Sequence, residues 1–137
     1  MPEEIYWLWL SMALGVCSDT AQIILEHEIW PERIYGMDCH MLRALGIFTP
    51  EQCQRIHEQK LDEAKELYRY CQKQGYQIIT IADSRYPRRL LALPDFPLVL
   101  YVQGNAELLK EMVRQPVLSV VGTRNFTRYG AQVTEMM

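Results

Sequence analysis

The feature that most constrains this chain is a change in the spacing of its apolar residues at Gly75. Up to about Gln74 they recur at helical spacing, whereas the later runs "YQIITIA", "LVLYVQG" and "VLSVV" have the composition of short strands. The segment "NAELLKEMV" predicts a helix between the second and third strands. The sequence therefore predicts an α/β fold class, with a helical domain over residues 1–75 followed by an α/β domain over residues 76–137.

The clearest predicted helix begins at "TPEQ". Thr49 can cap this helix, Pro50 suits its first position, and Gln52 completes a capping box. A narrow apolar stripe then predicts one continuous helix to about Gln74, ended by Gly75. We expect the stripe to pack in the core and the rest of the helix to face solvent.

An apolar run near the N-terminus, "IYWLWLSMAL", predicts a buried first helix with Trp7 and Trp9 in the core. The run is short and has no basic residue before it, so it matches neither a membrane span nor a signal peptide. We therefore expect a cytoplasmic protein with no membrane partner. A helix from Ser18 or Asp19 through Ile29 is predicted to follow, and then a short turn, "PERIYG".

A short helix is also predicted in "DCHMLRALGI", begun by Asp38 and ended by Gly46. Its end, "LRALGI", is loosely similar to a helix-hairpin-helix turn, which in its full form offers backbone amides to a DNA phosphate. The alternative is a turn that only packs two helices together in a small helical domain.

The cysteines and histidines do not have the spacing of metal ligands. There is no C-x-x-C pair, and neither His-Glu pair has the second histidine that H-E-x-x-H requires. We expect no metal site and no cofactor. Free buried thiols in a reducing cytosol are predicted instead, at Cys17, Cys39, Cys53 and Cys71.

The net charge of −3 is unevenly distributed along the chain. Residues 1–75 hold 7 Lys/Arg against 12 Asp/Glu, whereas residues 76–137 hold 7 against 5. An anionic partner would therefore dock on the second half, and a surface imbalance without any partner is the alternative.

The last predicted strand runs into the turn "VVGTRNFTRYG", which has features of an anion site. Gly122 allows a ligand close to the backbone, and the helix that follows points free amides toward the same place. Thr123 and Thr127 can supply hydroxyl donors, and the guanidinium of Arg124 matches two phosphate oxygens. The glycine spacing is neither that of a dinucleotide fingerprint nor that of a Walker A loop, so an ordinary strand-to-helix turn remains open.

Two separated motifs together resemble the bacterial DNA-processing family called DprA or Smf. They are "DSRYPRRLLALPDFPLVLYVQGN" and, about a dozen residues later, "VLSVVGTRNFTRYG". The matching positions are Asp83, Tyr86-Pro87, Leu90, Pro94 to Pro97, Leu100-Tyr101 through Gly104, Val121 to Arg124, and Tyr129-Gly130. The resemblance is tight over residues 83–130 and loose over the helical part.

This resemblance implies an extended Rossmann-like domain preceded by a small helical domain of the SAM or helix-hairpin-helix kind. It implies a protein that binds single-stranded DNA and hands it to the RecA recombinase during natural transformation, without catalysing a reaction, and that is a homodimer at full length. The family's Gly-[ST]-Arg turn takes part in phosphate binding. The expected DNA phosphate-binding residues are Gly122, Thr123, Arg124, Thr127 and Arg128.

A second group of arginines surrounds the Tyr-Pro motif. Arg85, Arg88 and Arg89 would suit a positively charged groove for single-stranded nucleic acid, and solvated arginines beside packed leucines are the alternative. Asp83 has no partner acid nearby, so we interpret it as a turn-capping or ion-pairing residue and not as a catalytic carboxylate.

One departure from the family pattern is the absence of its second glycine-rich segment, S-G-x-A-x-G-I-D, which completes the anion pocket. The chain is therefore expected to be the amino-terminal portion of a longer protein. An incomplete sheet would leave an unpaired edge, so we expect association, exchange of elements or poor order at the C-terminus. Two alternatives are a nucleotide-binding enzyme of the phosphoribohydrolase type and a helical interaction module.

Overall fold

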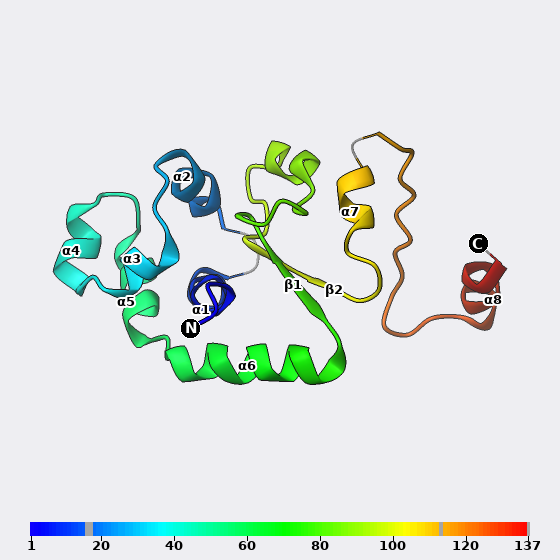
Figure 1. The fold of residues 1–137 in the computed structure, drawn as a ribbon, viewed down its shortest axis with the longest axis horizontal. Coiled ribbons are helices and arrows are strands. Elements are labelled where there is room, and N and C mark those ends of the chain that lie inside the picture. The colour runs from blue at the N-terminus through cyan, green and yellow to red at the C-terminus, as the bar shows by residue number, and fades with distance from the viewer. Residues whose placement is uncertain (16–17, 113, 137) are drawn as a thin grey trace.

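The computed structural model describes residues 1–15, 18–112 and 114–136 (Figure 1). In chain order its elements are α1 (Glu4–Leu14), α2 (Thr20–Glu26), α3 (Pro31–Tyr35), α4 (Cys39–Ala44), α5 (Pro50–Glu58), α6 (Leu61–Gln74), β1 (Gln77–Thr80), the 3₁₀ helix η1 (Arg88–Ala92), β2 (Val99–Val102), α7 (Leu108–Glu111) and α8 (Arg128–Met136). The fold is a mixture of helices with a small sheet, consistent with the predicted α/β class.

Helix α1 lies at the centre of the helical part. It packs against α3, α5 and α6 and also contacts both strands. Trp7 and Trp9 are buried in it, as predicted, and the indole Nε1 of Trp9 donates a hydrogen bond to the Gln59 carbonyl at 2.8 Å. Because helices of this length are marginal alone, this packing is what holds them.

The capping signals are confirmed at three helices. The Thr49 hydroxyl accepts from the Gln52 amide at 3.2 Å while the Gln52 side chain accepts from the Thr49 amide at 2.9 Å, which is the predicted capping box. The Asp38 carboxylate accepts from the third amide of α4. Gly46 and Gly75 have φ of 71° and 72°, as left-handed helix terminators.

The prediction of one helix from Thr49 to Gln74 is wrong. Gln59 and Lys60 have extended backbones, so the segment divides into α5 and α6. The Gln59 carbonyl accepts from the Trp9 indole, and the bend lets both helices pack on α1. The apolar stripe continues across the break, with Cys53 and Cys71 both buried.

Helix α2 is shorter than predicted. It ends at Glu26, and the next residues form a Schellman motif: the Ile29 amide donates to the Ile24 carbonyl at 3.1 Å and the Glu28 amide to the Leu25 carbonyl at 3.3 Å. This arrangement requires a left-handed residue, which here is Glu28 with φ of 49°.

The first two predicted strands are confirmed. β1 and β2 pair antiparallel, with Gln77 opposite Val102 and Thr80 opposite Val99. The predicted helix over residues 105–113 is observed as the shorter α7, and Val113 lies outside the described residues.

The third predicted strand, residues 117–121, is wrong. This segment has no strand pairing in the described structure, and its side chains are exposed, with Val121 91% exposed. A strand needs a neighbour to accept and donate its backbone hydrogen bonds, and none lies beside this segment in the described part of the chain. The sheet therefore has two strands here, and the wider Rossmann-like sheet stays an expectation.

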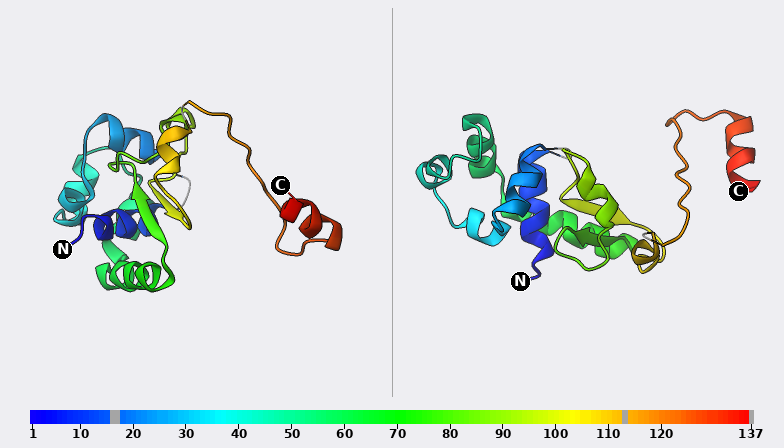
Figure 2. Two further views of the ribbon diagram at one scale, coloured as in Figure 1. Left: turned by 45° about the vertical axis from the view of Figure 1, so that its right-hand side comes forward. Right: turned by 90° about the horizontal axis from the view of Figure 1, so that it is seen from above.

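A single hydrophobic core spans both sides of Gly75. It joins buried residues of α1, α5 and α6 to Ile79, Phe96 and Val99 of the second half. Beyond this core, α8 stands apart at the end of an extended segment (Figures 1 and 2). The division into two domains at residue 75 stays a prediction, as does association through the C-terminal segment.

The cysteines that the structure describes carry free thiols. Cys53 and Cys71 are buried, as predicted, while Cys39 is half-buried, and Cys17 lies outside the described residues. Burial raises the pKa of both the Cys53 and the Cys71 thiol, which keeps them protonated and unreactive. In the described ranges no three potential ligands gather to hold a metal ion, and no described helix has the length and apolar character needed to cross a membrane.

Tyr86 connects the two halves of the turn between β1 and β2. Its ring is 2% exposed, and its hydroxyl donates to the Pro97 carbonyl at 2.7 Å. Burial raises the pKa of Tyr86 to about 12. The folded state thus keeps the proton that the unfolded chain loses near pH 10. The stability that the Tyr86 hydroxyl contributes is therefore complete below pH 10 and is lost as the pH rises from 10 through about 12.

We expect Tyr86→Phe to lower the free energy of unfolding by about 1–3 kcal/mol at pH 7, because the Pro97 carbonyl loses its donor. The variant should also lose less stability between pH 10 and pH 12 than the parent. Urea unfolding at pH 7, 10 and 11.5 measures both effects. An equal alkaline loss in parent and variant would contradict this role.

Candidate nucleic-acid interface

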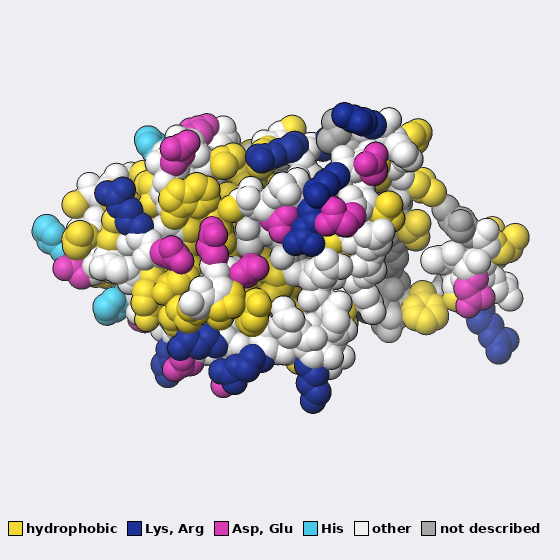
Figure 3. All heavy atoms as spheres, viewed as in Figure 1, with side chains coloured by type: hydrophobic (Ala, Val, Ile, Leu, Met, Phe, Trp, Pro, Cys, Tyr) yellow, Lys and Arg dark blue, Asp and Glu magenta, His cyan; other side chains and the backbone are white. Residues whose placement is uncertain are grey.

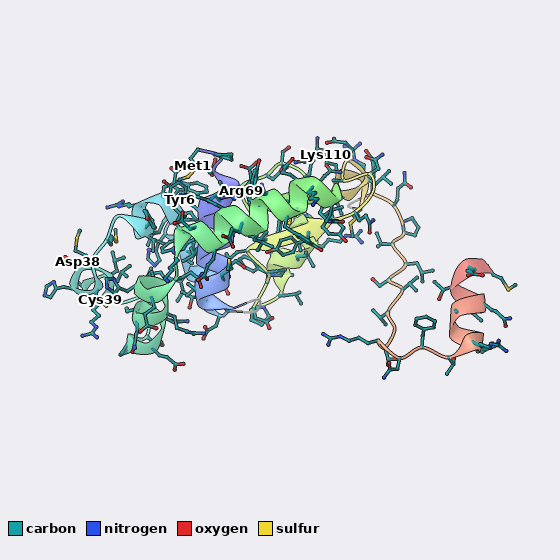
Figure 4. All side chains as sticks on the ribbon, turned by 90° about the horizontal axis from the view of Figure 1, so that it is seen from below. Met1, Tyr6, Asp38, Cys39, Arg69 and Lys110 are labelled. Atoms are coloured by element: carbon teal, nitrogen blue, oxygen red, sulfur yellow. The ribbon has the colours of Figure 1, made fainter. Side chains whose placement is uncertain are left out.

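The candidate anion site lies where the extended segment meets α8. A hollow of about 460 Å³ lies beside it, lined by residues 120–123, Phe126 and α8 residues between Gly130 and Glu135; Arg124, Thr127 and Arg128 are not part of this lining. The side chains here project into solvent on the ribbon of Figure 4, far from the end of the molecule that carries Asp38 and Cys39.

Gly122 is not required by the local packing. A Cβ atom built on it would meet no atom within 4 Å, and its φ is not in the left-handed region. The chain itself could therefore take a larger residue here. A ligand that approaches the backbone closely is one physical reason for glycine at such a position.

The two threonines of the turn differ in what they can still offer. The Thr123 hydroxyl donates to the Asn125 carbonyl at 2.6 Å, so its proton is engaged. The Thr127 hydroxyl accepts from the Gly130 amide at 3.1 Å, which caps α8 and leaves its own proton available. Of the two predicted hydroxyl donors, Thr127 is the one that can donate to a ligand in this conformation.

The start of α8 carries positive charge with no acid close by in sequence. Arg124 and Arg128 are exposed, and no described acidic side chain forms an ion pair with either. The sequence has no Asp or Glu between Glu111 and Glu135. The first amides of a helix have no intrahelical acceptor, so those of Arg128 and Tyr129 add partial positive charge at the same end.

Two aromatic side chains flank these arginines. Phe126 is 74% exposed and Tyr129 is 76% exposed. Exposed aromatic rings beside cationic side chains are the kind of stacking platform on which the bases of single-stranded nucleic acid bind. The sequence reasoning did not assign Phe126 a role, although the alternation of arginine and aromatic residues in "RNFTRY" was a signal that could have found it.

The second arginine group lies elsewhere. Arg88 and Arg89 are exposed on η1, which is drawn yellow-green and is separate from the red α8 in every view (Figures 1 and 2). Arg85 is instead held by Asp83, whose carboxylate receives the guanidinium at 2.6 and 3.0 Å and the Arg85 backbone amide at 2.8 Å.

These contacts confirm the turn-capping and ion-pairing interpretation of Asp83. The hydrogen bond from Arg85 holds the pKa of Asp83 below its usual range. The Arg85 guanidinium also donates to Gln77 at 3.1 Å and lies 3.9 Å from Glu107. Its charge is therefore balanced within the protein, which leaves less of it for a phosphate.

The turn after α4, loosely similar to a helix-hairpin-helix turn, offers little to a phosphate here. The Gly46 amide already donates to the Arg43 carbonyl at 3.1 Å, and Leu42 is buried in the core. These features fit the helix-packing alternative.

Comparison with known proteins gives a family match for the second half of the chain. Residues 77–137 match the family model described as DNA recombination-mediator protein A. Through this segment, the chain matches the DprA/Smf family. The matched segment contains Asp83, Arg85, Tyr86 and the whole of the Gly122–Arg128 turn.

Two relatives in the DprA/Smf family are similar over different lengths. The DNA processing protein DprA of Bacillus subtilis is 38% identical over 74 residues, which is 54% of this chain and 23% of that protein. The protein Smf of Synechocystis sp. is 28% identical over 134 residues, which is 96% of this chain and 33% of that protein. The chain thus spans at most about a third of these relatives. No solved structure matches.

Proposed function

We propose that this chain takes part in DNA processing by binding single-stranded DNA along the surface from Gly122 to Tyr129. The observation that carries the proposal is the exposed pair Arg124 and Arg128, without acidic partners among the described residues, at a helix N-terminus flanked by Phe126 and Tyr129. Phosphates would bind the guanidinium groups and free amides, and bases would stack on the rings. The names of the relatives support a DNA-processing role.

The cellular role that follows is that of a DprA/Smf protein, which brings single-stranded DNA to RecA in natural transformation and recombination. It acts in the cytoplasm by binding and not by catalysis, as a homodimer at full length. Its helical residues 1–75 would form a SAM or helix-hairpin-helix-like domain, and residues 76–137 would belong to a Rossmann-like domain. The exposed arginines at 88 and 89 would make a secondary contact, whereas Arg85 is engaged by Asp83.

The glycine of the turn gives a test that separates binding from folding. Because a side chain at position 122 would point into open space, Gly122→Val should leave the thermal unfolding midpoint unchanged. It should weaken binding of fluorescein-labelled oligo(dT), because the added methyl groups keep a phosphate from the backbone. Fluorescence anisotropy at low salt measures the affinity.

A matched control is Ser119→Val, which adds similar bulk to the same exposed segment outside the turn. Equal affinities for the Gly122 and Ser119 variants would overturn the phosphate role of the turn. Hydrolysis of a nucleoside monophosphate by the parent protein would instead favour the phosphoribohydrolase-like alternative.

A further inference from the structure

A small apolar cavity opens on the opposite half of the molecule from the candidate DNA surface. It has a volume of about 100 Å³ and lies between Trp7 of α1, Ile24 of α2, Ile81 after β1 and the α2–α3 connection. A cavity of about 150 Å³ holds benzene, so this one has room for a branched aliphatic side chain. Its outer wall is Trp30.

Trp30 is held in place yet open to solvent. It is 48% exposed, and it packs edge-on against the buried Trp7, with ring centroids 5.8 Å apart. Large aromatic side chains that are fixed on one side and exposed on the other are typical anchors of protein interfaces. The ring also offers a face to a cationic group.

Glu28 stands at the rim of this cavity in a costly conformation. Its φ of 49° places it at the left-handed position of the Schellman motif, where glycine is usual and other residues are strained. Glu28 is exposed and is one of the residues that line the cavity. Backbone strain of this kind supports a hypothesis of function at the residue that bears it.

A second recess adjoins the cavity and shares Trp7 with it. It has a volume of about 230 Å³ and is lined by three acidic residues, Glu3, Glu4 and Asp83, of which Asp83 is paired with Arg85. No lysine or arginine lines either hollow among the described residues. Figure 3 shows acidic and hydrophobic side chains side by side on one face of the molecule, together with lysine and arginine side chains.

We propose that the cavity and the recess together form a docking site for a segment of a partner protein in which an aliphatic side chain is flanked by lysine or arginine. The aliphatic group would fill the cavity beside Trp30. The flanking cations would lie against Glu28 and over Glu3 and Glu4 of the recess, since Asp83 is already paired with Arg85. A nucleic acid or an anionic membrane is disfavoured, because its phosphates would meet the acidic residues Glu3, Glu4 and Glu28, while the guanidinium of Arg85 is already paired with Asp83.

The probe for this site is a fluorescein-labelled nonapeptide with one central leucine, two lysines on either side and glycine elsewhere. Glu28→Gln is expected to weaken its binding about two- to fivefold, the usual effect of one exposed ion pair. Trp30→Ala is expected to weaken binding about tenfold, because the variant lacks the apolar surface and the cation–π face of the indole. Fluorescence anisotropy measures both affinities.

Matched controls separate this site from general electrostatics. Glu66→Gln removes an exposed carboxylate from α6 and should leave the affinity unchanged. Glu28→Gly should relieve the backbone strain, so that it unfolds at the same or a higher temperature while it binds the peptide more weakly. Replacing the central leucine of the peptide with alanine should also weaken binding.

Three results would overturn the proposal. The first is equal binding by the Glu28→Gln and Glu66→Gln variants. The second is displacement of the peptide by oligo(dT), which would show that the site does not distinguish a cationic peptide from a nucleic acid. The third is self-association of the parent, seen by analytical ultracentrifugation and abolished in Trp30→Ala, because the occupant would then be a second copy of this chain.

Discussion

Replacing Trp9 with alanine is expected to lower the free energy of unfolding by about 3–5 kcal/mol, the usual range for a buried large aromatic residue. Trp9 is 2% exposed, and it packs edge-on against Tyr35, with centroids 5.2 Å apart. Its indole also satisfies the Gln59 carbonyl at the break between α5 and α6. Small domains are stable by only about 5–15 kcal/mol, so this one change brings the protein close to unfolding.

Urea unfolding followed by far-UV circular dichroism measures this loss without relying on the altered tryptophan. The matched variant is Trp9→Phe, which keeps most of the buried area and removes only the N–H donor. It should cost about 1–3 kcal/mol, the penalty for an unsatisfied carbonyl. If alanine cost no more than phenylalanine, packing around Trp9 would not be what holds α1 against α5 and α6.

The second large effect is expected at the DNA surface. Replacing both Arg124 and Arg128 with alanine should lower the affinity for oligo(dT) at low salt by about tenfold or more for each, as expected for hydrogen bonds to charged groups worth about 1.5–3 kcal/mol. The slope of log affinity against log salt should fall by about 0.7 for each phosphate that the variant no longer neutralises. Oligo(dA) should lose as much affinity as oligo(dT), because binding to phosphates carries no base preference.

Controls show whether charge or geometry matters. Arg69→Ala removes an exposed cation from α6, where Figure 4 labels it, and should leave the salt slope unchanged. Arg124→Lys keeps the charge but loses the planar fork, so it should keep the slope and lose part of the affinity. An unchanged slope in the double alanine variant would show that these arginines do not contact phosphates.

The helix boundaries were predictable wherever one short stretch of sequence supplies the whole signal. The capping box of Thr49 and Gln52, the Asp38 cap and the glycine ends at positions 46 and 75 all depend on residues within one turn of each other. Such hydrogen bonds form with little help from the rest of the fold.

The features that the sequence did not predict depend on distant partners. The break at Gln59 is stabilised by Trp9, 50 residues earlier. The segment 117–121 has the composition of a strand, but composition cannot supply a neighbouring strand to pair with it. Glu28 is a local exception: the Schellman hydrogen bonds around it run to Ile24 and Leu25, but it takes a left-handed position that propensity assigns to glycine or asparagine.

The candidate site was predicted in part. The sequence located the turn, its glycine and its arginines, because a strand-like run followed by glycine and a helix start is a local pattern. It did not predict that the Asn125 carbonyl would engage the Thr123 hydroxyl, and it predicted an ion-pairing or turn-capping role for Asp83 without naming Arg85 as the partner. Those assignments depend on the side-chain geometry of the folded chain.

The most direct measurement of the central claim is a titration of the ¹⁵N-labelled protein with oligo(dT), followed through its backbone amide resonances. Proposed binding at the start of α8 predicts the largest shifts at Gly122 to Tyr129, and these shifts should decrease as salt is added. Shifts confined to the turn after α4 or to η1, with Gly122 to Tyr129 unchanged, would contradict it.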